Sequence, residues 1–352
     1  MRAVVTVLFT IALCAAQAPK DNPEHLFNEA LAAQQRGDLE TAVADYEQVL
    51  RIMPGLIAAR ANLAAAQLQM GHVDDAIQSY RTALHQDSKN IQLAVLLGDV
   101  YVGQHRYGEA VSLLAPIEKA HPENLNVAFL MGEALIDQNQ LADGLKRVER
   151  VAAARKDGNA WTLAALTELR LGQYTKAAAS AEEALRLDPG APGIYTISGM
   201  AKAANGDTAG AKAAYRKALE INPDDFDANL RLGTLLLRDG EDLAGARPYL
   251  ERAFRLNPES LSAIFEMGQL AVAEKQDAEA IRDFEQVAQR APNLLEPHVR
   301  LAVLYARAHR ASDAAREKET VDHLMAQQQQ QDPNALPDDL LRQQINGPPP
   351  SH

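Results

Sequence analysis

Cysteine is almost absent from this chain of 352 residues, which contains only Cys14, and aromatic residues make up just 5% of it. Because Cys14 lies in an N-terminal segment that we expect to be removed, the mature chain can form no disulfide and offers no thiolate nucleophile. Alternating runs of β-branched residues bounded by turns are also missing, which argues against a sheet-based fold. Basic charge is in deficit: the net charge is -12 at pH 7. We therefore expect no nucleic-acid partner, since phosphate binding requires a basic face.

The motifs that usually carry catalysis are missing as well. The nine histidines are scattered, and no pair has the HExxH spacing of a zinc site. The GxSxG motif of serine hydrolases does not occur. A glycine-rich stretch at residues 206–212 lacks the GK[ST] ending of a phosphate-binding loop and does not follow a strand. We therefore predict that the chain is not an enzyme and binds neither a metal nor a cofactor.

The N-terminal segment has the pattern of a secretory signal peptide. Met1-Arg2 brings one positive charge, Val4 to Ala16 is an apolar run, and small residues surround the expected cleavage point. The run is shorter than a comfortable membrane span. We predict a signal peptide over residues 1–16, a short leader over residues 17–22, and an exported chain with no transmembrane segment after cleavage. An exported chain without disulfides fits a bacterial envelope protein, either periplasmic or secreted.

Cys14 also admits a second interpretation, as the acylated residue of a lipoprotein. Such signals usually carry a small residue just before the cysteine, and here that residue is Leu13. We therefore expect no lipid anchor at Cys14.

One stretch, residues 193–225, recurs with variations along most of the chain. Within it, small residues at Gly199 and Ala211 would let two short helices approach closely, while Tyr215 fills the space between them. Gly206 would end the first helix, and Pro223 would end the second. The small residue in the second helix recurs every 33 to 35 residues, at Ala42, Ala76, Ala110, Gly144, Ala177, Ala211, Ala246, Ala280 and Ala314.

This pattern resembles the tetratricopeptide repeat family, whose unit is a helix-turn-helix of about 34 residues. The resemblance covers residues 23–325 and implies an all-α fold, a right-handed α-solenoid of about nine stacked repeats. The family is united by architecture and by binding proteins or peptides, so the resemblance is specific for fold and weakly specific for function. Beyond the array, a glutamine run and several prolines follow, and we predict a disordered tail over residues 326–352.

Two places interrupt the regularity of the array. Pro116 falls inside a second helix and should kink or shorten it. Around residues 148–159, Gly144 replaces the usual alanine and no terminating proline appears. This junction is either a drifted repeat, the interpretation we favour, or a hinge between two parts of the array. Trp161 follows it and is expected to be a packing residue.

In the family, the first helices of the repeats line the inner wall of the superhelix, where partners lie. Transferring that wall to this sequence gives an earlier set of candidate binding residues, Asn62, Gln69, Asp99, Phe129, Glu133 and Asp137. The later set is arginine-rich: Arg170, Arg231, Arg238, Arg300 and Arg307.

The later set suggests an arginine-lined groove for a carboxylate or an acidic peptide, because arginine grips carboxylates through two parallel donors. The alternative is structural. Asp227 stands four residues before Arg231, and Glu296 stands four before Arg300, so both arginines can form ordinary ion pairs along their own helices. The sequence does not decide between the two.

Two functions remain compatible with the sequence. The leading hypothesis is an exported scaffold or adaptor that binds proteins or extended peptides, in envelope assembly or secretion. The alternative is an accessory subunit that presents substrates to a separate enzyme, such as a glycosyltransferase or a peptidase. Self-association through an exposed terminal repeat is a third role that the pattern permits.

Overall fold

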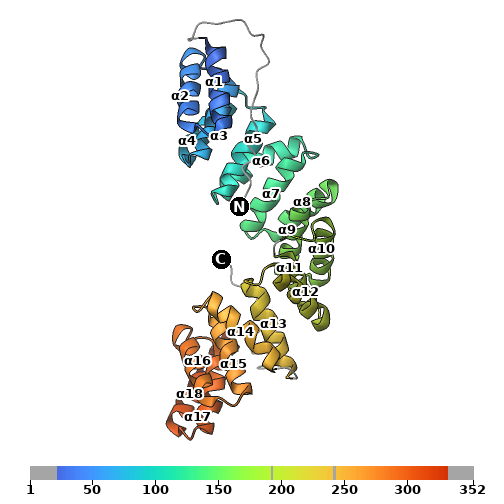
Figure 1. The fold of residues 1–352 in the computed structure, drawn as a ribbon, viewed down its shortest axis with the longest axis vertical. Helices are drawn as coiled ribbons and strands as arrows, with labels where there is room; N and C mark the ends of the chain where they lie inside the picture. Colours follow the sequence, from blue (N-terminus) through green and yellow to red (C-terminus); the bar gives the residue numbers. More distant parts are fainter. Residues whose placement is uncertain (1–21, 192, 241–242, 332–352) are drawn as a thin grey trace. The chain divides into compact units, whose positions relative to one another are not determined.

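The computed structural model describes residues 22–191, 193–240 and 243–331, and every regular element in these ranges is a helix (Figure 1). The predicted signal peptide, Cys14 and the part of the predicted tail from residue 332 onward lie outside the described residues. The chain divides into two compact units, with the boundary between Lys156 and Asp157. This boundary falls inside the irregular junction that the sequence singles out at residues 148–159.

The first unit contains four helix-turn-helix hairpins. Its helices are α1 (Pro23–Arg36), α2 (Leu39–Ile52), α3 (Ile57–Gln69), α4 (Val73–Gln86), α5 (Ile91–Gly103), α6 (Tyr107–Ala120), α7 (Leu125–Asp137) and α8 (Leu141–Arg155).

The second unit contains five hairpins. Its helices are α9 (Gly158–Arg170), α10 (Tyr174–Leu187), α11 (Ile194–Ala204), α12 (Thr208–Ile221), α13 (Phe226–Asp239), α14 (Leu243–Leu256), α15 (Leu261–Ala273), α16 (Asp277–Arg290), α17 (Leu295–Arg307) and α18 (Ala311–Gln331).

Short-range chemistry sets where the helices begin and end. Side chains of Asn, Asp or Ser accept a hydrogen bond from the first turn of many helices, as Asn124 does for α7 and Asp225 does for α13. Each hairpin turns through one residue with a positive φ, and these residues are Gly37, Gly71, His105, Asn139, Gly172, Gly206, Gly240, Lys275 and His309. The left-handed conformation stops the first helix and lets the chain reverse.

Close packing inside the hairpins depends on the small residues that repeat along the chain. The alanine of the second helix is fully buried in seven of the hairpins, at Ala42, Ala76, Ala110, Ala177, Ala211, Ala246 and Ala280. In the first helix, a Cβ added at Gly199 would lie 2.5 Å from the ring of Tyr215. At Gly233 it would lie 2.6 Å from Leu250. These contacts confirm the predicted close approach of the two helices.

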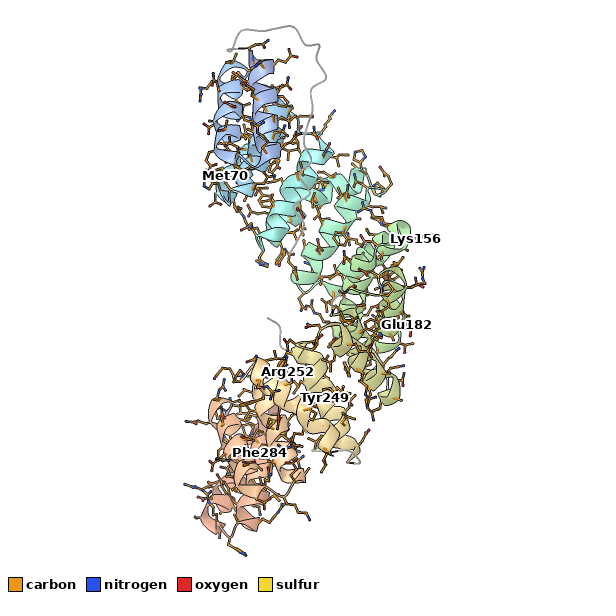
Figure 2. All side chains as sticks on the ribbon, viewed as in Figure 1. Met70, Lys156, Glu182, Tyr249, Arg252 and Phe284 are labelled. Atoms are coloured by element: carbon orange, nitrogen blue, oxygen red, sulfur yellow. The ribbon has the colours of Figure 1, made fainter. Side chains whose placement is uncertain are left out.

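Successive hairpins stack within each unit, so that every hairpin buries its apolar face against a neighbour. The core of the first unit centres on residues such as Leu97 and Leu114, both at most 2% exposed. The second unit has comparable clusters around Tyr215 and Phe284, the latter labelled in Figure 2. Trp161 packs against one of these clusters, as predicted. The structure thus confirms an all-α helical repeat solenoid.

The end of the array differs from the prediction. Helix α18 has 21 residues and continues to Gln331, whereas the sequence pattern placed residues 326–331 in the disordered tail. Glutamine is a good helix former, so a glutamine run can extend a helix that is already nucleated.

Candidate functional site

The first helices of the hairpins carry the candidate residues, and several neighbouring first helices contact each other directly. Such contacts join α1 to α3 and α5 to α7 in the first unit, and α9 to α11 and α13 to α15 in the second. Where two first helices are in contact, side chains near the same repeat position lie on one shared surface. The repeat spacing therefore indicates which side chains belong to that surface.

In the first unit, the earlier set of candidates divides by exposure. Gln69 on α3, Asp99 on α5 and Asp137 on α7 are exposed, while Phe129 and Glu133 on α7 are partly buried. Phe129, Glu133 and Asp137 follow one another at intervals of four residues, so they share one face of α7. This face presents one aromatic side chain flanked by two carboxylates.

Asn62 requires a correction, because the structure places it in the interior and not on the wall. Its side chain is 0% exposed and forms a hydrogen bond with Tyr46 of α2. The residue therefore supports packing between α2 and α3 and cannot contact a partner in this structure.

In the second unit, carboxylate partners can be named for Arg231, Arg300 and Arg307. Arg231 lies 3.8 Å from Asp227, one turn earlier on α13. Arg300 forms a closer pair with Glu296 on α17, at 2.8 Å. Arg307 lies 3.0 Å from Asp277, at the start of α16.

These ion pairs leave the arginines available to other ligands. The side chains of Arg231, Arg300 and Arg307 remain 35%, 41% and 51% exposed. Asp227 is also 56% exposed, so its pair with Arg231 is worth at most about 1 kcal/mol and exchanges readily. Glu296 is only 12% exposed, so its pair with Arg300 is not a surface ion pair. Arg170 and Arg238 lie on the exposed ends of α9 and α13.

Sequence reasoning missed a carboxylate that lies among these arginines. Glu266 on α15 is partly buried and forms a side-chain hydrogen bond with Thr234 of α13. Burial raises the pKa of Glu266, while the positive charges of Arg238 and Arg300 oppose that rise. The repeat period could have revealed it, since Glu266 stands 35 residues after Arg231 and 34 before Arg300.

Two sets of three side chains occupy matching repeat positions on α13, α15 and α17. The charged row consists of Arg231, Glu266 and Arg300, and its signs alternate. The apolar row consists of the residues that immediately precede them, Leu230, Phe265 and Val299. All six side chains are partly exposed. Phe265 is held in place by Phe284 of α16, with the ring centroids 5.2 Å apart.

The first unit holds a cavity of about 410 Å³ between α4, α5 and α6, lined by Arg81, Leu84, His85, Leu97, Tyr101, Glu109, Ser112 and Leu113. Three of its polar side chains bind one another. Arg81 donates hydrogen bonds to the Tyr101 hydroxyl, at 2.6 Å, and to Glu109, at 2.7 Å. The Arg106 guanidinium lies 5.2 Å from the centre of the Tyr101 ring and also binds Glu109. This network joins consecutive hairpins.

Two kinds of feature are missing from the described residues. No group of three or more His, Cys, Asp or Glu side chains there is arranged to hold a metal ion. None of the helices placed by the structure combines the length and the hydropathy that a bilayer span requires.

Sequence models of the tetratricopeptide repeat match most of the array. One matches residues 33–99, 101–166 and 202–242, a second matches residues 237–294, and a third matches residues 158–190. The chain belongs to the tetratricopeptide repeat family. No curated protein matches this tetratricopeptide repeat chain closely enough to count as a relative.

Solved structures with a similar fold include other proteins of this architecture. One is the C-terminal part of a tetratricopeptide repeat-containing protein from Cytophaga hutchinsonii, with 15% identity and a TM-score of 0.56. The match covers 68% of this chain and 98% of that one. Another is a chain of the APC/C hetero-tetramer Cut9-Hcn1, with 13% identity, a TM-score of 0.55, and coverage of 92% and 76%. At these identities the likeness concerns the fold alone.

Proposed function

We propose that this tetratricopeptide repeat chain is an exported, non-catalytic scaffold that captures protein segments on its first helices, in envelope assembly or secretion. The observation that carries the proposal is the pair of rows across α13, α15 and α17. Partly exposed apolar side chains stand there beside arginines whose charges remain accessible. An apolar strip with a few placed charges is the usual composition of a surface that binds a peptide.

Export is the part of the proposal that rests on the sequence alone. The pattern of residues 1–16 supports it. N-terminal sequencing of the protein recovered from an envelope fraction would test it, with Gln17 expected as the first residue. An uncleaved chain that starts at Met1 and stays in the cytoplasm would contradict export and leave the binding role intact.

Capture of partners tests the binding role. The mature chain, immobilised and exposed to envelope extract, is expected to retain specific proteins. The double variant Arg231→Ala and Arg300→Ala is expected to lose them, because both side chains belong to the charged row. A retained protein with a catalytic domain would favour the accessory-subunit role over the scaffold role.

A matched control changes the same charge elsewhere in the second unit. Arg186 on α10 and Arg282 on α16 belong to second helices, and their side chains are 62% and 71% exposed. The double variant Arg186→Ala and Arg282→Ala should capture partners as well as the natural sequence does. Equal capture by both double variants would contradict a binding role for the charged row.

A further inference from the structure

The cavity between α4, α5 and α6 has an apolar floor and a polar rim. Leu97 of α5 is only 2% exposed, and Leu84 of α4 and Leu113 of α6 are partly buried. Ser112 leaves space on the α6 side, because its hydroxyl folds back and donates a hydrogen bond to the Gly108 carbonyl at 2.7 Å. The cavity volume of about 410 Å³ lies within the range of about 300–1,000 Å³ that is usual for ligand sites.

The rim has hydrogen-bond donors that are not in use. Both carboxylate oxygens of Glu109 accept from arginines, Oε1 from Arg81 and Arg106, and Oε2 from Arg106. Arg81 uses only two of its five N–H donors, one on the Tyr101 hydroxyl and one on Glu109. The three other donors of Arg81 have no acceptor among the residues that the structure describes. The rim is therefore suited to an anion and not to a cation.

The unused donors and the apolar floor are close enough for one short segment to reach both. On α4, Leu84 and His85 follow Arg81 at positions i+3 and i+4, which are its neighbours on the helix surface. The Cβ atoms of such neighbours lie about 5–6 Å apart. In an extended chain, residues two positions apart point to the same side and lie about 6.6 Å apart. An apolar and an acidic residue at that spacing therefore match Leu84 and Arg81.

We infer that this cavity is a separate binding site, which takes an apolar side chain of an extended protein segment together with a carboxylate two positions away. The apolar side chain packs on Leu84, Leu97 and Leu113, and the carboxylate binds Arg81. The inference goes beyond the proposed function. Arg81 and Ser112 belong to second helices, whereas the proposed capture uses the first helices of the hairpins.

Peptides with blocked ends test the inference, and methyl NMR of the mature chain with labelled leucines shows where they bind. The matching peptide is Ser-Gly-Leu-Ser-Asp-Gly-Ser, which should shift the methyl signals of Leu84 and Leu113. It should bind about three- to tenfold more tightly than the same peptide with asparagine in place of aspartate, because a hydrogen bond to a charged group is stronger than a neutral one. Replacement of the peptide leucine by alanine should weaken binding by a similar factor, since less apolar surface is buried.

Two substitutions in the protein separate the floor from the rim. Ser112→Leu should fill the cavity and abolish binding of the matching peptide, while Ser312→Leu makes the same change at an exposed site on α18 and should leave binding intact. Arg81→Gln should remove the preference for aspartate over asparagine. Its control is Arg150→Gln on α8, because the Arg150 side chain is 43% exposed, close to the 48% of Arg81. Circular dichroism melting shows whether each variant is folded.

Equal affinity for the aspartate and asparagine peptides would overturn the inference, and so would binding that survives Ser112→Leu. Methyl shifts confined to leucines outside the cavity would place the peptide elsewhere and contradict it. If the signals of Leu84 and Leu113 changed with protein concentration in the absence of peptide, a second copy of the chain would occupy the cavity, against the inference. Partner capture that still depends on Arg231 and Arg300 would leave the proposed function standing in each case.

Discussion

At the scale of single residues, a buried polar side chain often binds the carbonyl of the proline that ends the preceding hairpin. Asn229 donates hydrogen bonds to the carbonyl oxygens of Pro223, at 2.9 Å, and Asp225, at 2.8 Å. His298 contacts the Pro292 carbonyl in the same way, at 3.1 Å. In both pairs the donor stands six residues after the proline. The bonds to Pro223 and Pro292 tie the segment between hairpins to the helix that follows it. The Asp225 carbonyl also accepts the backbone N–H of Asn229.

Replacement of Asn229 tests this role. Asn229 is 3% exposed, so Asn229→Ala should lower the free energy of unfolding by about 1 kcal/mol, the net contribution of a lost side-chain hydrogen bond. Urea denaturation followed by circular dichroism measures the change. The control Asn293→Ala alters an exposed asparagine and should have an effect below about 0.5 kcal/mol. Equal effects of the two substitutions would contradict a stabilising role for the hydrogen bonds that Asn229 donates.

Buried tyrosines make the fold sensitive to alkali. Burial raises the pKa of Tyr46, Tyr80 and Tyr215 above the ordinary value of 10.0. The unfolded chain releases these protons first, so the stability they confer is complete below about pH 10 and is lost as the pH rises above it. Each tyrosine should lower the free energy of unfolding by about 1.4 kcal/mol per pH unit in that range.

Tyr215→Phe isolates one of these contributions. Tyr215 is 1% exposed, and the substitution removes the ionisable group while keeping the ring. Thermal melting above pH 10 should then show a shallower loss of stability with pH than the natural sequence. A Tyr215→Phe variant with the natural pH dependence would contradict this account.

The repeat period predicts which residues share a row, but not how deep each one lies. Asn62, Arg231, Glu266 and Arg300 all occupy one repeat position, yet only Asn62 is fully buried. Its neighbours on α3 are mainly alanines, and Tyr46 of α2 reaches it. How deeply a residue is buried depends on the sizes of the side chains around it, and the repeat period carries no information about those sizes.

At the scale of the helical element, the turns inside the hairpins show how much of the backbone can be predicted from the positions of glycine. Five turns could be predicted from their glycines, Gly37, Gly71, Gly172, Gly206 and Gly240. The other four take the same left-handed conformation without glycine. Packing on both sides of those turns fixes the backbone despite the cost of a Cβ there. The repeat period predicts where these four turns lie, whereas a search for glycine residues does not find them.

Pro116 shows the limit of an argument from a single residue. The sequence predicts a kinked or shortened helix; α6 is not shortened, since it has 14 residues, as many as α2 and α4. Packing against α5 and α7 supplies the stability that keeps the helix at full length. The proline still removes one helical hydrogen bond, to the carbonyl of Ser112.

Pro116→Ala should therefore stabilise the chain. Pro116 is exposed, so the substitution loses no packing, and it should raise the free energy of unfolding by about 1–3 kcal/mol. Urea denaturation measures the gain. The control Pro122→Ala changes an exposed proline outside the helices and should not stabilise. A loss of stability in Pro116→Ala would show that the proline is needed for the shape of α6.

At the scale of the whole molecule, the chain is organised as two units, each with its own hydrophobic clusters. Helices α1 to α8 belong to the first unit, and α9 to α18 belong to the second. Lys156, labelled in Figure 2, ends α8 in a left-handed conformation with φ of 53°. Repeats contact mainly their neighbours, so stability in such a chain is approximately a sum over adjacent hairpins. Each unit has several hairpins, which is enough to bury a core.

The two units should fold independently when the chain is divided at this boundary. Polypeptides of residues 22–156 and 157–331, made separately, are each expected to be helical by circular dichroism and to melt cooperatively. A control polypeptide of residues 121–156 holds only the hairpin of α7 and α8, which cannot bury its apolar face alone and should not fold. If residues 22–156 were unfolded alone but folded when joined to the second unit, the first unit would depend on its neighbour. That result would contradict a division of the chain into self-sufficient units.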